Sequence, residues 1–128
     1  MKVFLSSLLV FSAIIFSSFQ PRPITSEIVT DLKNANYTGL YVFFAQTVQI
    51  NVIDASGSYN GEQASLVMNA FSVKYVTTNF ILSKISKLPN GHLVTGTLMT
   101  KKGNLNASIT TTIAKNELIT AISITANK

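Results

Sequence analysis

The C-terminal part of the chain, from Thr77 to Ala126, divides into four strand-like segments separated by short turns. Apolar and polar side chains alternate along these segments, most clearly between Leu105 and Lys115, and a period of two is typical of half-buried strands. Loops this short join neighbouring antiparallel strands, so the pattern predicts a meander of hairpins. The predicted strands are Thr77–Leu88, His92–Lys102, Leu105–Lys115 and Leu118–Ala126, with turns at Pro89-Asn90-Gly91, Gly103-Asn104 and Asn116-Glu117.

The segment before this meander combines helical and strand-like patterns. Ile24–Asn36 predicts a helix capped by Thr25 or Ser26, because Ile28, Leu32 and Ala35 fall on one face. Asn36-Tyr37-Thr38-Gly39 interrupts it, and a second short helix is expected over Leu40–Ala45. A strand over Val48–Ile53, a turn at Asp54–Gly57 and a brief strand at Ser58–Asn60 follow, and Asn60 then caps a helix that runs to about Tyr75.

Helices gathered before an antiparallel sheet define the α+β class, so we expect a curved antiparallel sheet with the N-terminal helices packed on its concave face. This order of elements resembles the nuclear-transport-factor-2-like fold, also called cystatin-like. A narrower resemblance rests on Asn36–Leu40 through Phe44, Val48-Gln49-Ile50, Ser58–Ala64 through Phe71, Gly96-Thr97-Leu98 and Leu118–Ile124. In these motifs the chain resembles a family of small secreted bacterial proteins classed as a domain of unknown function. The wider fold implies a cone with a pocket between sheet and helices, and the family carries no established chemistry.

The first nineteen residues have the composition of a secretory signal peptide. Lys2 precedes a run of apolar residues that extends to Phe16, and the small residues Ser17 and Ser18 follow it. The alternative is a permanent membrane anchor, but serines interrupt the run and it is short for a membrane span. We therefore expect a signal peptide over residues 1–19, a single domain over residues 20–128, and a periplasmic or extracellular location.

Composition excludes several classes of chemistry. The chain has 128 residues with no Cys and one His, so disulfides, a thiolate nucleophile, Cys-type zinc sites and two-histidine relays are all excluded. Charged residues make up only 12%, and the sequence contains no phosphate loop, no nucleophile elbow and no His-Glu-x-x-His motif. The sequence therefore predicts no metal, no cofactor and no catalytic residues.

The individual ionisable residues are better explained by local structure than by catalysis. Asp54 follows the first strand and is expected to stabilise its turn. Glu62 suits the first turn of a helix, Glu117 suits a hairpin turn, and His92 directly follows a turn, where histidine is usually exposed. The alternative is a small lyase- or isomerase-type enzyme of the same fold that uses Asp54 or a pocket tyrosine as its acid–base group.

Aromatic side chains are the best candidates for a binding pocket. Tyr41, Phe44, Phe71 and Tyr75 are among the largest side chains in the helical half, and together they would form a ligand site without catalytic groups. The alternative interpretation of each is a core residue.

Charge is distributed unevenly along the chain. Residues 20–63 carry two basic and four acidic side chains, whereas residues 64–128 carry seven lysines and one glutamate. The lysines are expected at the two ends of the meander, where they keep strand edges unpaired or weakly attract an anionic surface. Nucleic acid is excluded as a partner because the sheet contains no arginine and no basic–aromatic motif.

These observations predict an exported, non-catalytic domain that binds a small apolar ligand or a partner protein in the cell envelope. A structural homodimer formed through the sheet is the third possibility.

Overall fold

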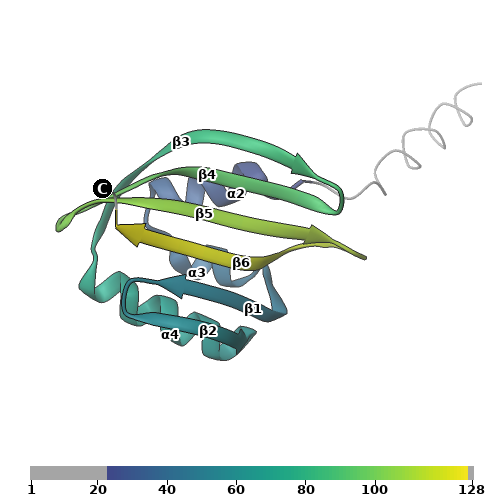
Figure 1. The fold of residues 1–128 in the computed structure, drawn as a ribbon, viewed down its shortest axis with the longest axis horizontal. Helices are drawn as coiled ribbons and strands as arrows, with labels where there is room; N and C mark the ends of the chain where they lie inside the picture. The colour runs from purple at the N-terminus through teal and green to yellow at the C-terminus, as the bar shows by residue number, and fades with distance from the viewer. Residues whose placement is uncertain (1–22, 127–128) are drawn as a thin grey trace, which may run out of the picture.

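A single six-stranded sheet forms the frame of the molecule, with strand order β2-β1-β6-β5-β4-β3 (Figure 1). The structure, a computed structural model, describes residues 23–126, and the predicted signal peptide lies outside these residues. The helices cover one face of the sheet. The elements are α2 (Thr25–Lys33), α3 (Tyr37–Tyr41), β1 (Phe44–Val52), β2 (Ala55–Asn60), α4 (Gly61–Lys74), β3 (Thr77–Leu88), β4 (Gly91–Thr100), β5 (Gly103–Ile113) and β6 (Glu117–Ala126).

The predicted meander of four strands is confirmed. β3, β4, β5 and β6 pair in sequence order, each antiparallel to the next. Gly103, the first residue of β5 directly after the turn, has φ 124°, a conformation that favours glycine, which explains why the turn ends at this residue. The predicted turns lie within two residues of the observed ones.

The predicted α+β fold class is confirmed, and the sheet differs from the predicted antiparallel one only in a single parallel pair of strands. β1 pairs antiparallel with β2 but parallel with β6, so that Ile50 lies opposite Ile122. Parallel neighbours require a long crossover connection. The chain between β1 and β6, which contains α4 and three strands of the meander, provides that connection.

The helix boundaries differ from the predicted ones near Asn36. α2 ends in a Schellman motif, in which Ala35 has φ 54° and the Asn36 N–H donates to the Asp31 carbonyl over 2.7 Å. The predicted interruption of the helix is confirmed, since Asn36 lies in the break between α2 and α3, where its side chain caps α3 by accepting from the N–H of Gly39. The predicted N-cap of α4 is confirmed, since Asn60 Oδ1 accepts from the N–H of Gln63 over 2.8 Å.

The core lies between the helices and the inner face of the sheet. Alternate residues of β5 point inward, and Leu105, Ala107 and Ile109 are buried. α2 contributes Ile28 and Leu32, while α3 and α4 contribute Leu40 and Phe71 among others. The buried apolar residues also include Tyr37, Leu40, Val48, Ile50, Val52, Ala64, Met68, Phe71, Phe80, Val94, Leu98, Ile119, Ile122 and Ile124.

Among residues 23–126, no helix is both long and apolar enough to cross a membrane.

Lysines gather at the two ends of the meander, where the turns of its hairpins lie. Lys87 and Lys115 lie near the β3–β4 and β5–β6 turns, and Lys101 and Lys102 form the β4–β5 turn at the opposite end.

Candidate functional site

A groove with an apolar lining lies between α4 and the hairpin formed by β1 and β2. Its volume is about 260 Å³. Val67, Ala70, Phe71 and Lys74 follow the helical spacing i, i+3, i+4 and i+7, so they share one face of α4. Ala70 and Ala55 are small, which leaves space between the helix and the hairpin. We call this site the α4 groove; it is lined by Val52, Ala55, Val67, Ala70 and Phe71, with Asp54 and Lys74 at one side.

Asp54 and Lys74 form an ion pair in the wall of the α4 groove. Lys74 Nζ lies 2.7 Å from Asp54 Oδ2, and about half of each side chain is exposed. The hydrogen bond that Lys74 donates to Asp54, followed by the negative charge of Asp54, raises the pKa of Lys74. The structure places Asp54 in the β1–β2 turn, as the sequence predicts, and Lys74 remains a cation beside the groove.

The four aromatic residues predicted to line a pocket form two separate ring pairs. The centroids of Tyr41 and Phe44 are 5.3 Å apart, and those of Phe71 and Tyr75 are 5.2 Å apart in a stacked arrangement. Of the four, Phe71 lines the α4 groove. Tyr41 instead donates its hydroxyl to Asn69 Oδ1 over 2.6 Å.

The phenol of Tyr41 is held in its neutral form. Burial, followed by the nearby Tyr37, raises the pKa of Tyr41 to about 12. Burial also raises the pKa of Tyr37, whose hydroxyl lies 2.6 Å from Thr77 Oγ1. Both tyrosines therefore act as hydrogen-bonding groups at neutral pH and not as bases.

Two lysines surround Tyr75 at the C-terminal end of α4. The ammonium group of Lys74 lies 5.8 Å from the centre of the Tyr75 ring, and that of Lys102 lies 5.3 Å from it. The β4–β5 turn is held against this end of the helix, because the N–H of Lys101 donates to the Val76 carbonyl over 3.0 Å. The ammonium groups of Lys74 and Lys102 therefore form a positively charged region beside the α4 groove, and Lys74 belongs to both.

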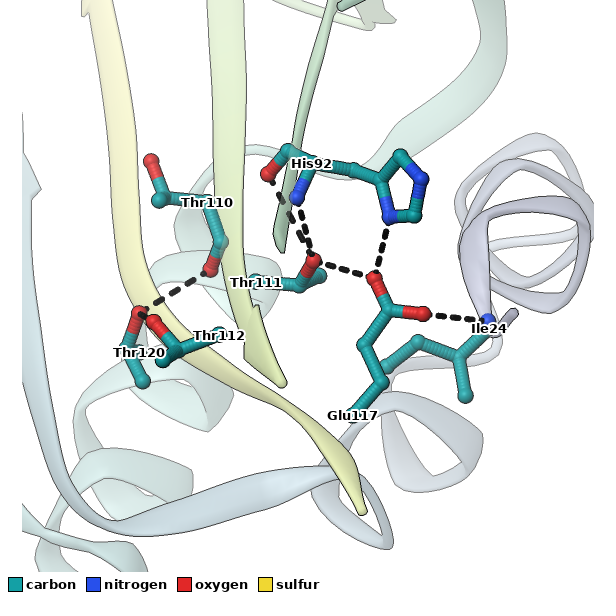
Figure 2. Close-up of polar contacts among 7 residues, drawn as sticks. All are labelled: Ile24, His92, Thr110, Thr111, Thr112, Glu117 and Thr120. Carbon is teal, nitrogen blue, oxygen red and sulfur yellow. Dashed lines mark hydrogen bonds and ion pairs between the residues drawn. The ribbon is translucent and has the colours of Figure 1, made fainter. Parts of the chain in front are cut away.

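A buried carboxylate lies at the other end of the sheet, where Glu117 begins β6 (Figure 2). Its Oε1 accepts from the N–H of Ile24 over 3.2 Å, and its Oε2 accepts from the hydroxyl of Thr111. His92 Nδ1 lies 2.6 Å from the same Oε2. Because an ionised carboxylate only accepts hydrogen bonds, Nδ1 carries a proton. We call Glu117, His92, Thr111 and the Ile24 N–H the Glu117 cluster.

The Glu117 cluster corrects two sequence predictions. Glu117 is not an exposed turn residue, since only 5% of it is accessible, and the side chain of His92 is 19% exposed. Burial alone would raise the pKa of Glu117. The hydrogen bonds from Thr111, His92 and Ile24, together with the charge of His92, outweigh burial and hold that pKa below its ordinary value. The cluster therefore attaches the start of α2 to three strands.

A period-two signal for this cluster exists in the sequence. Thr111 continues the buried series of Leu105, Ala107 and Ile109, and Glu117 lies two residues before the buried Ile119. Thr111 also lies opposite His92 in the β4–β5 pairing. Treating Glu117 as part of the turn hides this inward-facing position.

A second hollow lies on the outer face of the sheet, away from the helices. It has a volume of about 300 Å³ and is lined mainly by uncharged polar side chains. Thr95 and Thr97 of β4, Asn106 and Ser108 of β5, and Ser123 of β6 contribute to it. Because its hydroxyl and amide groups are well hydrated, this surface offers less gain from burying an apolar ligand than the α4 groove does.

The six-stranded mixed sheet with helices on one face defines the class of the protein: it is an α+β domain of the nuclear-transport-factor-2-like (NTF2-like) fold. An NTF2-like protein of unknown function from Cytophaga hutchinsonii superposes with a TM-score of 0.57 at 13% identity, over 81% of this chain and 87% of that one. Residues 25–125 match the family described as domain of unknown function DUF4783, and the chain belongs to that family.

Structures of DUF4783 family proteins are similar over nearly their whole length. The protein from Bacteroides ovatus has a TM-score of 0.73 at 22% identity, and the similarity extends over 97% of its length and 85% of this chain. The protein from Bacteroides uniformis has a TM-score of 0.74 at 22% identity, over 94% of its length and 79% of this chain. A comparison with curated proteins gave no match.

Proposed function

We propose that this domain is a non-catalytic binding protein that acts after export and holds a small apolar molecule in the α4 groove. The observation that carries the proposal is the alignment of Val67, Ala70 and Phe71 along one face of α4, opposite Val52 and Ala55. The volume of the α4 groove, about 260 Å³, lies just below the range of roughly 300–1,000 Å³ typical of ligand pockets. The ligand is therefore expected to be one short chain or one ring.

The chemistry beside the groove supports binding over catalysis. Lys74 and Asp54 neutralise each other at 2.7 Å. The pKa of about 12 keeps Tyr41 un-ionised, so this tyrosine does not serve as a base at neutral pH. The enzymatic alternative, in which Asp54 acts as the acid–base group, requires a turnover that is lost in Asp54→Asn.

A series of linear alcohols tests the groove without any charge on the ligand. Each methylene that becomes buried contributes about 0.8 kcal/mol, which corresponds to a roughly fourfold lower Kd per added carbon. We expect titration calorimetry to show this trend from butanol upward until the groove is full. A flat series would contradict an apolar groove.

Two tryptophan variants on the same helix locate the binding. Ala70→Trp places a large ring in the groove and should weaken octanol binding at least tenfold. Val73→Trp is the matched control, because Val73 is 80% exposed on another face of α4 and does not line the groove. Equal weakening by both variants would remove the assignment to this groove.

Partner binding along β3 is a second candidate, since β3 forms one edge of the sheet. Its apolar side chains Ile81, Leu82 and Ile85 are 38–52% exposed. A second copy of the chain could pair along this edge and form a structural homodimer. Light scattering at micromolar concentration tests it, and a monomer at those concentrations would contradict it.

A further inference from the structure

We propose that the ligand of the α4 groove is an alkyl carboxylate, whose chain lies along Phe71 while its head group binds Lys74 and Lys102. This inference rests on the proposed function, because it uses the same groove and assigns the chemical class of its ligand. It goes further by adding Lys102 and Tyr75, which do not line the groove, to the binding site.

The first support is the position of Lys74. This residue lines the groove together with Phe71 and at the same time lies 5.8 Å from the centre of the Tyr75 ring. Tyr75 in turn stacks on Phe71 with the ring centres 5.2 Å apart. The apolar wall and the ammonium group are therefore parts of one continuous structure, which suits a ligand with an apolar chain and a charged head.

The second support is an excess of positive charge. The ammonium groups of Lys74 and Lys102 lie beside the Tyr75 ring at the C-terminal end of α4, while Asp54 is the carboxylate that contacts Lys74. The end of a helix contributes only about −0.5 elementary charge. Two ammonium groups exceed Asp54 and the helix end together, so the potential beside the groove favours an anion over a cation.

The third support is the exposure of the existing ion pair. Lys74 and Asp54 are 51% and 54% exposed in their side chains, and Asp54 lies in a turn. Exposed pairs of this kind are weak, so a ligand carboxylate can share or replace Asp54 at low cost. Meanwhile Asp54 keeps Lys74 charged and in place in the absence of ligand.

The test compares three probes of equal chain length: octanoate, octan-1-ol and octylammonium, titrated below the concentrations at which they form micelles. We expect octanoate to bind about tenfold tighter than octanol at low salt, about threefold from each lysine, and octylammonium to bind most weakly. The advantage of octanoate should shrink as ionic strength rises, because the ion pairs are exposed.

Variants connect this preference to the two lysines. The double variant Lys74→Met, Lys102→Met should abolish the preference, so that octanoate binds this variant no more tightly than octanol binds it. Lys84→Met, on β3, is the matched control and should change neither. Circular dichroism checks that each variant keeps its fold.

The outcomes separate this inference from the proposed function. If octanol binds, is blocked by Ala70→Trp, and octanoate binds no more tightly than octanol, the groove stands and the carboxylate assignment is wrong. If octanoate binds but Ala70→Trp leaves it unaffected, attraction to surface lysines alone explains the result and the inference is overturned. If no probe binds, the proposed function fails and the inference fails with it.

Discussion

Glu117 and His92 form a hydrogen-bonded pair, with 2.6 Å between Oε2 and Nδ1, in which the carboxylate is almost completely buried. The two residues come from β6 and β4, which are separated in the sheet by β5. Thr111 of β5 donates to the same oxygen, so three adjacent strands meet at one carboxylate. Since Glu117 also accepts from the Ile24 N–H, the pair fixes the position at which α2 begins.

Replacing Glu117 by Gln should destabilise the domain by about 1–3 kcal/mol. The amide retains the size of the side chain but loses the charge-assisted bonds, and its NH₂ group faces donors. Urea denaturation measures the change. Glu62→Gln is the matched control, because Glu62 is exposed in the first turn of α4 and should cost less than about 1 kcal/mol. Equal losses in the two variants would contradict the role of the Glu117 cluster.

The stability that Glu117 contributes should depend on pH in the acidic range. The folded-state pKa of Glu117 lies below its ordinary value, so the folded protein favours the ionised carboxylate. The contribution is therefore complete above the unfolded-state pKa and is lost as pH falls through the lower folded-state pKa. The difference in unfolding free energy between wild type and Glu117→Gln should shrink between pH 6 and pH 3. A difference that grows on acidification would mean that the folded-state pKa is raised.

Gly91→Ala should destabilise the protein by about 3 kcal/mol, the upper end of the usual cost of overpacking. A Cβ at Gly91 would overlap the Thr111 carbonyl oxygen, so β4 and β5 would have to separate beside the Glu117 cluster. Thermal unfolding followed by circular dichroism provides the measurement. Asn90→Ala, at the exposed neighbouring position, is the control and should change the stability by less than about 1 kcal/mol.

Ala35→Gly should stabilise the domain by about 0.5–1 kcal/mol. Ala35 has φ 54° at the end of α2, and a left-handed conformation costs a residue with a Cβ roughly 1–2 kcal/mol. Glycine avoids that cost, although part of the gain is offset by the greater entropy of its unfolded chain. Urea denaturation should show a higher midpoint with an unchanged slope. Ala114→Gly, in the exposed β5–β6 turn, is the comparison. If Ala35→Gly raises the free energy of unfolding no more than Ala114→Gly does, the prediction is contradicted.

Local sequence patterns predict the elements of this fold better than they predict the partners of those elements. The alternation along β5 and the turn at Gly103 locate the meander, because both signals lie within a few residues. The parallel pairing of β1 with β6 joins residues about seventy positions apart, such as Ile50 and Ile122, and no local period encodes it. The direction of β1 is set by the crossover through α4 and the meander.

The same distinction applies to the candidate sites. Phe71 is recognisable from its size as a wall residue, but the space beside it depends on the small side chains of Ala55 and Ala70, which come from different elements. Size and aromaticity also predict Tyr41 and Phe44 as pocket-lining residues, and in the structure their rings pair with each other. A cavity depends on how side chains from different elements are placed in space, and the order of residue types along the sequence contains little information about that placement.

Asp54→Asn should strengthen octanoate binding about threefold relative to octanol binding by the same variant. Asp54 competes with a ligand carboxylate for Lys74, with which it is in contact at 2.7 Å, and the substitution removes that competitor while keeping the size of the side chain. Titration calorimetry at low salt measures both ligands. Asp31→Asn is the matched control, since Asp31 lies on α2 and contacts Asn36. If octanoate binding weakens in Asp54→Asn, then Asp54 acts by holding Lys74 in position and does not compete with the head group.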